Sequence, residues 1–208
     1  MANVIAQSGQ GGTASISLDR QWTTSSGSPD DYYGVVTDYY EEYTLTATPD
    51  TGYLFDKWAG VKANGSSLSA TTSNPFTFSL LVKSHDNEGD YIPSAIPYTY
   101  TANFTKKRYA ITVAVKDGQS ARGTVSGGGT YEHGASCTAT ATATQGWKFD
   151  HWETADGTEV SSDNPYTFTV TGPTNLYAVF EHDGTGQLLH GSSGTLLHGS
   201  AGSLLYDD

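Results

Sequence analysis

One short stretch of this chain occurs twice. Residues 52–58 read GYLFDKW, and residues 146–152 read GWKFDHW. Three further blocks recur around this motif in the same order, and they are the pairs GTAS and GTVS, SNPFTF and DNPYTF, and YTANF and LYAVF. An ordered set of repeated blocks indicates one structural unit used twice. We therefore expect two related modules rather than one large domain.

The two copies differ in the spacing between their shared blocks. The first copy has extra residues at about 21–37, before its aromatic motif, and at about 84–96, after its Asn-Pro block. Surface loops tolerate insertions, whereas packed cores do not. We therefore predict two long loop insertions in the first module, where it could have gained a specific function.

Alternation of apolar residues predicts β-strands. In the second copy Ile111, Val113 and Val115 alternate with Thr112 and Ala114, which is the period of a half-buried strand. The same period occurs over residues 137–141, 166–170 and 176–180. The chain has 24 Gly and only 15% charged residues, a composition that favours strands and tight turns over helices. The predicted fold class is all-β and mainly antiparallel.

These patterns divide the chain into three parts. The first module is expected at 1–107 and the second at 108–183, joined by a short basic linker at 106–108. From residue 184 the composition changes to Gly, Ser and Leu, and this repetitive tail continues to residue 208.

The tail repeats every eight residues as Gly, a polar residue, two Leu and an aromatic residue. Two consecutive Leu on a strand point to opposite faces, so both faces of such a strand are apolar. We therefore predict that the tail is enclosed by other chains and serves anchoring or oligomerisation, with a flexible linker as the alternative. The predicted assembly residues are Leu188, Leu189, His190, Leu196, Leu197, His198, Leu204, Leu205 and Tyr206. In a threefold assembly His190 and His198 could form rings that hold an ion, the alternative being aromatic packing.

Charge and cysteine content exclude several classes of protein. The chain has 10 Lys+Arg against 22 Asp+Glu and a net charge of −12, which disfavours nucleic acid and anionic membranes as partners. The lone Cys137 permits no internal disulfide, and we expect no metal or cofactor. The start of the chain lacks the pattern of a secretory signal, and no stretch is apolar enough for a membrane span.

The candidate chemical sites are few, and each has a structural alternative. Ser84, His85 and Asp86 are neighbours in sequence and so do not converge as a catalytic triad must. The acidic run 86–90 has the spacing of a calcium loop, but its glycine is misplaced, so a solvated acidic insertion is favoured.

The aromatic and small residues of the repeats also receive predictions. Trp58 and Trp152 hold equivalent positions, which predicts a core role rather than a binding one. Cys137 is expected to be a small buried residue, and His133 and His151 are expected at the surface. A candidate contact loop consists of Asp30, Asp31, Tyr32 and Tyr33. Its alternative is a Tyr-rich edge that packs on its own domain.

Together the motifs resemble a known family. Gly-aromatic-x-Phe-Asp-x-Trp, then Asn-Pro-aromatic-Thr-Phe, then Tyr-Ala-Val-Phe, is similar to the divergent internalin B-repeat, a small β-rich module of bacterial surface proteins and phage structural proteins. The second copy matches along its whole length, and the first matches at its blocks. The resemblance implies a spacer, adhesive or assembly role and no catalytic residues. The ending of the chain also resembles, more loosely, the C-terminal tails of tailed-phage structural proteins.

We therefore expect a non-enzymatic virion structural protein of a tailed phage, as a capsid decoration or fibre-like accessory protein assembled in the cytoplasm of the bacterial host. Its expected partners are other virion proteins and copies of itself, and a host-surface glycan or protein is a further candidate. The alternative is an adhesive repeat protein of the bacterial cell surface. A carbohydrate-degrading enzyme would need a carboxylate pair in a rigid cleft, and the sequence offers none that we can nominate.

Overall fold

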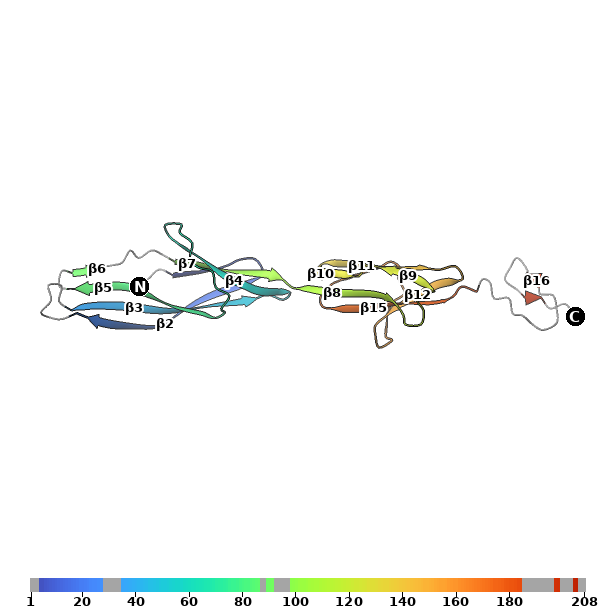
Figure 1. Ribbon diagram of the computed structural model, residues 1–208, viewed down its shortest axis with the longest axis horizontal. Coiled ribbons are helices and arrows are strands. Elements are labelled where there is room, and N and C mark those ends of the chain that lie inside the picture. Colours follow the sequence, from blue (N-terminus) through green and yellow to red (C-terminus); the bar gives the residue numbers. More distant parts are fainter. Residues whose placement is uncertain are drawn as a thin grey trace. The chain divides into compact units, whose positions relative to one another are not determined.

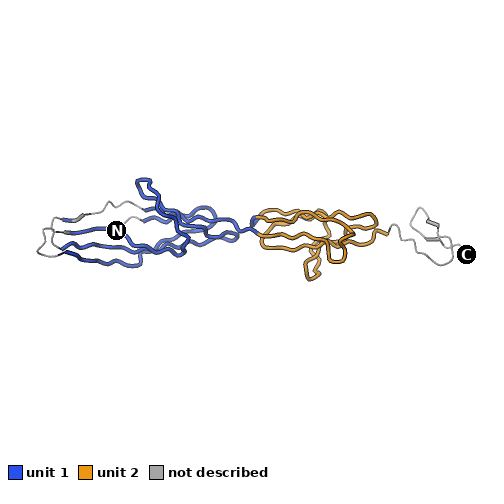
Figure 2. The backbone as a smooth tube through the Cα atoms, viewed as in Figure 1, with its two compact units in different colours: residues 1–108, 132–134 blue, residues 109–131, 135–208 orange. Residues whose placement is uncertain are grey.

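The computed structural model describes residues 4–27, 35–86, 89–91 and 98–184, and the backbone of 197–198 and 204–205. Within these ranges the chain forms strands and no helix, which confirms the all-β prediction. The chain divides into two compact units, residues 1–108 with 132–134 and residues 109–131 with 135–208 (Figure 2).

The first unit is built from two sheets (Figure 1). One has the strand order β1-β7-β4 and the other the order β2-β3-β5-β6. The strands are β1 (Val4–Ser8), β2 (Gly12–Ser26), β3 (Val36–Pro49), β4 (Tyr53–Lys62), β5 (Phe76–Asp86), β6 (Gly89–Tyr91) and β7 (Tyr98–Lys106). The pairing is antiparallel except between β1 and β7, which run parallel.

The second unit repeats this plan. Its sheets have the orders β10-β8-β15-β12-β13 and β14-β11-β9. The strands are β8 (Arg108–Val115), β9 (Gly123–Ser126), β10 (Gly129–Glu132), β11 (Ser136–Ala143), β12 (Trp147–Glu153), β13 (Glu159–Ser161), β14 (Tyr166–Thr169) and β15 (Thr174–His182). Strands β8, β15 and β12 correspond to β1, β7 and β4, and the parallel pair recurs between β8 and β15. The basic segment predicted as a linker mostly belongs to strands, because β7 ends at Lys106 and β8 begins at Arg108.

Each core lies between the two sheets of its unit and is centred on the repeated tryptophan. Trp58 and Trp152 have no exposed surface, which confirms their predicted place in the core. Around Trp58 the buried residues are Leu45, Ala47, Tyr100 and Ala102. Around Trp152 they are Ala139, Ala141, Leu176, Ala178 and Phe180. Cys137 is also fully buried, as expected.

A β-bulge explains the Phe-Asp-x-Trp spacing of the motif. Trp follows Phe by three positions, so a regular strand would place the two rings on opposite faces. The register of β4 against β7 shifts between Phe55 and Lys57, and β12 shifts against β15 between Phe149 and His151. The motif Asp is thus the extra residue of the bulge. Consequently both rings of each motif pack in the core, with Phe–Trp centroid distances of 5.8 and 5.3 Å.

The two tryptophans differ in one hydrogen bond, and this difference is testable. The indole Nε1 of Trp152 donates to the carbonyl oxygen of Asp163 at 3.0 Å, whereas the buried Nε1 of Trp58 has no hydrogen-bond partner among the described residues. Trp152→Phe should therefore cost about 1 kcal/mol more than Trp58→Phe, because only the first removes a hydrogen bond. Urea denaturation followed by circular dichroism measures both costs. Equal costs would contradict this assignment.

The asparagine before each proline also recurs with the same contacts. The side-chain Oδ1 of Asn74 accepts from Ala47 N at 2.9 Å, and its Nδ2 donates to Ala47 O at 2.7 Å. Asn164 makes the same two bonds to Ala141, at 2.9 and 2.7 Å. Each side-chain amide therefore pairs with the backbone of β3 or β11 as a strand residue would. The strand that follows starts after the proline, at Phe76 in β5 and at Tyr166 in β14.

The insertions of the first copy are partly strands, which corrects the prediction of two long loops. The register of β2 against β3 continues from Gly12 and Pro49 to Ser26 and Val36. Strand β5 follows β3 to His85, and β6 pairs with β5. In Figure 1 these strands continue past the ends of β4 and β7. We call residues 19–26, 36–43 and 79–86 the strand extension.

Part of the predicted assembly tail lies in the described residues. Strand β16 (Leu197–His198) pairs antiparallel with β17 (Leu204–Leu205), so that Leu197 faces Leu205 in the register. The other assembly residues, Leu188, Leu189, His190, Leu196 and Tyr206, lie outside the described part of the chain.

Candidate binding surface

The strand extension carries an aromatic row on its outer face, the face of β2-β3-β5 turned away from buried Leu45. The register aligns Trp22 of β2, Tyr40 of β3 and Leu81 of β5 across three neighbouring strands. The Trp22 and Tyr40 rings are stacked, with centroids 5.3 Å apart and planes inclined by 12°. Both rings are half-buried, and Leu81 is 39% exposed. The row is thus accessible, and its members support one another.

Polar pairs lie on both sides of this row. On the side of the row that is nearer to the core along the strands, Arg20 forms a two-point ion pair with Glu42 on the outer face. The nitrogen–oxygen distances are 2.9 and 3.1 Å. The Arg20 guanidinium also lies 4.7 Å from the centre of the Trp22 ring. On the other side, Ser84 Oγ donates to Asp38 Oδ1 at 2.6 Å. These contacts hold the charged groups beside the rings in fixed positions.

Another polar group lies next to the Arg20 pair. Asp19 is the bulge residue of β2, and it accepts hydrogen bonds from Thr44 and Ser17. These two bonds hold the pKa of Asp19 below its ordinary value. Asp19 therefore stays ionised at neutral pH and fixes the bulge on the outer face.

The inner face of the extension contains a buried carboxylate. Glu41 is 2% exposed and accepts hydrogen bonds from Gln21 Nε2 and Tyr43 Oη, both at 2.7 Å. Burial, together with the bond to Glu41, raises the pKa of Tyr43. The hydroxyl of Tyr43 therefore remains a donor at neutral pH. This cluster joins the extension to the core, because Tyr43 stacks on Phe78 at 6.0 Å.

The second unit has no counterpart of the aromatic row among its described residues. Both units share a hydroxyl pair on the outer face, Thr44 with Thr77 at 2.8 Å and Thr138 with Thr167 at 2.9 Å. Strand β9 ends at Ser126 opposite Thr140 and β14 ends at Thr169 opposite Ser136, whereas the first unit continues into the extension. The aromatic row is therefore an addition to a shared framework.

The repeated framework identifies the family of the chain. A family model for the divergent InlB B-repeat domain matches residues 3–108 and 111–184. The chain belongs to this family. Comparison with curated proteins and with solved structures gave no match. The two units are tandem B-repeats, which confirms the resemblance noted in the sequence, and the strand extension is part of the first B-repeat.

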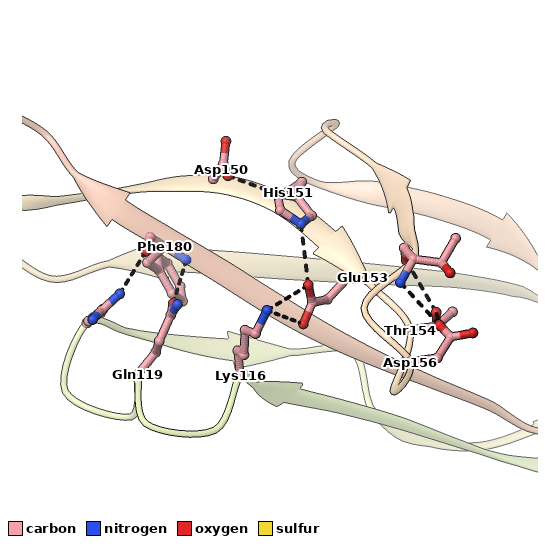
Figure 3. A network of polar contacts seen from close by, with 10 residues as sticks. Lys116, Gln119, Asp150, His151, Glu153, Thr154, Asp156 and Phe180 are labelled. Atoms are coloured by element: carbon pink, nitrogen blue, oxygen red, sulfur yellow. Dashed lines mark hydrogen bonds and ion pairs between the residues drawn. The ribbon is translucent and has the colours of Figure 1, made fainter.

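The second B-repeat carries a polar network on a different sheet (Figure 3). Glu153 is 6% exposed, and both its oxygens contact Lys116 Nζ, at 2.8 and 2.9 Å. His151 lies between Asp150, at 2.9 Å, and Glu153, at 3.6 Å. His151 is thus half-buried within a network of polar contacts rather than at an open surface position.

The loop after β8 completes this network. Gln119 Oε1 accepts from Phe180 N at 2.8 Å (Figure 3). Arg122 Nη1 donates to Phe180 O at 3.2 Å. Arg122 also lies 4.1 Å from the centre of the Trp147 ring. Gln119 and Arg122 thus form hydrogen bonds with the β15 backbone at Phe180, beyond Ala178, where the pairing of β15 with β8 ends. We interpret the network as structural, because it holds this loop against β15.

The remaining sequence candidates show no chemical site. Ser84 bonds to Asp38, and because His85 is its strand neighbour the two side chains point to opposite faces. His133 is half-buried rather than fully exposed. In the described ranges no group of three or more His, Cys, Asp or Glu side chains is arranged to hold a metal ion. No described helix could cross a membrane.

Two further predictions fall on residues that are not described. The contact loop of Asp30, Asp31, Tyr32 and Tyr33 lies outside the described residues, in the connection between β2 and β3. In the acidic run 86–90, the side chains of Asp86, Asn87, Glu88 and Asp90 also lie outside the described residues. The aromatic row itself was missed in the sequence, because Trp22, Tyr40 and Leu81 meet only through the strand register.

Proposed function

We propose that this chain is a non-enzymatic structural protein of a tailed-phage virion, and specifically a capsid decoration or fibre-like accessory protein. The residues that the two B-repeats share serve the fold: the bulge Asp, the core Trp and the Asn that bonds a neighbouring strand. Modules of this kind are suited to display on the outside of a particle. The proposed partners are other virion proteins and copies of this chain, assembled in the cytoplasm of a bacterial host.

The observation that carries this proposal is the repeated Leu doublet of the tail. Three Gly-polar-Leu-Leu units follow the second B-repeat, and two of them contribute the paired strands β16 and β17. A pair of strands this short is marginal in water without a surrounding surface. We infer that the tail anchors the B-repeats to a larger assembly.

Removing residues 184–208 tests the anchoring role. The truncated chain should be lost from purified particles, while circular dichroism shows that its strands remain. A full-length control in which the six tail Leu are replaced by Ser should also be lost, because it keeps the length and removes the apolar side chains. Incorporation of the truncated chain at the level of the intact chain would refute the proposal.

A second candidate is an adhesive repeat protein of the bacterial cell surface. The aromatic row favours it, because an accessible aromatic surface with fixed polar groups beside it suits ligand binding, which adhesion requires. Fractionation of producing cells separates the two candidates. The virion proposal expects the chain in particles, whereas the adhesin alternative expects it in the cell envelope.

A further inference from the structure

The aromatic row on the outer face of the strand extension is about as long as a small ligand. Neighbouring strands lie about 4.8 Å apart, so the row from Trp22 to Leu81 spans about 10 Å, the length of one or two sugar rings. A stable protein interface buries about 800 Å² on each partner, far more than two half-buried rings and one exposed leucine supply. The size of the row therefore favours a small ligand over a protein.

The polar groups around the row match the chemistry of hydroxyl groups. Arg20 is 64% exposed, although Glu42 and the Trp22 ring hold its guanidinium in place. Its remaining N–H groups can donate, and the carboxylates of Glu42 and Asp38 can accept. A donor and an acceptor thus lie on one side of the aromatic surface, and an acceptor lies on the other. A pyranose ring offers the complement, with C–H groups on its face and hydroxyl groups at its rim.

Charge narrows the class of sugar. The Arg20 charge is already paired with Glu42, and Asp38 and Asp19 add negative charge beside the row. The chain as a whole carries −12. An anionic glycan would therefore be repelled both locally and at long range. A neutral glycan meets no such barrier.

We propose that the outer face of the strand extension binds a neutral oligosaccharide. Its ring packs on Trp22 and Tyr40, and its hydroxyl groups bond to Arg20, Glu42 and Asp38. The prepositioned side chains reduce the entropy cost of binding. This inference rests on the proposed role as an exposed virion component, because it names what that component contacts.

A printed array of neutral and acidic oligosaccharides, followed by calorimetric titration of the full chain with the best neutral hit, tests the proposal. We expect binding to a neutral glycan, with a Kd that changes by less than about twofold between about 50 and 500 mM NaCl. Trp22→Ala and Tyr40→Ala should each weaken it by at least about tenfold, as truncation of a central aromatic contact does. Tyr177→Ala, which removes a half-buried aromatic from the second B-repeat, should leave the Kd within about twofold.

Three results would overturn the proposal: no neutral glycan bound, binding confined to acidic glycans, or unchanged affinity of a folded Trp22→Ala chain. Thermal denaturation establishes that each variant is folded. The outcome is separable from that of the anchoring test, because tail removal reports incorporation into particles and leaves the strand extension intact.

Discussion

Replacing Gly123 with alanine is expected to lower the free energy of unfolding by about 3 kcal/mol. Gly123 begins β9, and a Cβ there would lie 2.7 Å from the carbonyl oxygen of Thr142 and would overlap the ring of Phe180. The ring belongs to the core, and the carbonyl belongs to the backbone of the paired strand, so neither can move cheaply. Urea denaturation of the full chain measures the loss.

Two matched variants control this prediction. Gly12 is the equivalent residue of the first B-repeat, where a Cβ would lie 2.6 Å from Thr48 O and would meet the Phe104 ring, so Gly12→Ala should cost a similar amount. Gly172→Ala adds its Cβ where no atom lies within 4 Å and should change stability by less than about 0.5 kcal/mol. If Gly123→Ala were as mild as Gly172→Ala, the described packing of Phe180 on β9 would be wrong.

Replacing Asn164 with alanine is expected to cost about 2 kcal/mol. The Asn164 amide is bonded to both the N–H and the carbonyl of Ala141, which is 6% exposed. Removal of the amide leaves a donor and an acceptor of a nearly buried residue without these bonds. The cost is measured by urea denaturation, as for the glycine variants.

Two further variants make the test of Asn164 specific. Asn175→Ala removes an exposed asparagine on β15 and should change stability by less than about 0.5 kcal/mol. Asn164→Asp keeps the acceptor but places a carboxylate against Ala141 O, so it should not restore the lost stability. A stability equal to that of the original chain for Asn164→Asp would show that the donor bond contributes nothing.

Much of the fold could be predicted because its signals are local. Strand β8 has alternating apolar residues at Ile111, Val113 and Val115, and alternation requires no knowledge of the partner strand. The core role of Trp152 followed from its recurrence at Trp58. Even the bulge had a readable signal, since the separation of three between Phe149 and Trp152 fits one strand face only with an extra residue.

The strand extension could not be predicted, because its residues lack that alternation. The segment of β2 from Gln21 to Ser26 is mostly exposed Ser and Thr, which in sequence is typical of a loop. It forms a strand because β3 pairs with it along its length. The aromatic row depends further on the bulge at Asp19, which sets the register that brings Trp22 opposite Tyr40.

The pair of hydrogen bonds that Asn164 makes could likewise not be predicted from local sequence patterns. The Asn-Pro pair was interpreted as the opening of a strand, yet the important group is the asparagine side chain and its partner is Ala141 on another strand. Recurrence of Asn74 and Asn164 was the available signal. It indicated a shared role, and the structure supplies the contact.

Quantitative mass spectrometry of particles purified from infected bacteria tests the proposed function most directly. We expect peptides of both B-repeats in the particles, in a fixed ratio to the major capsid protein, and none in particles made with the chain that ends at residue 183. Recovery of the chain only from the cell envelope or from the soluble fraction, with none in the particles, would contradict it.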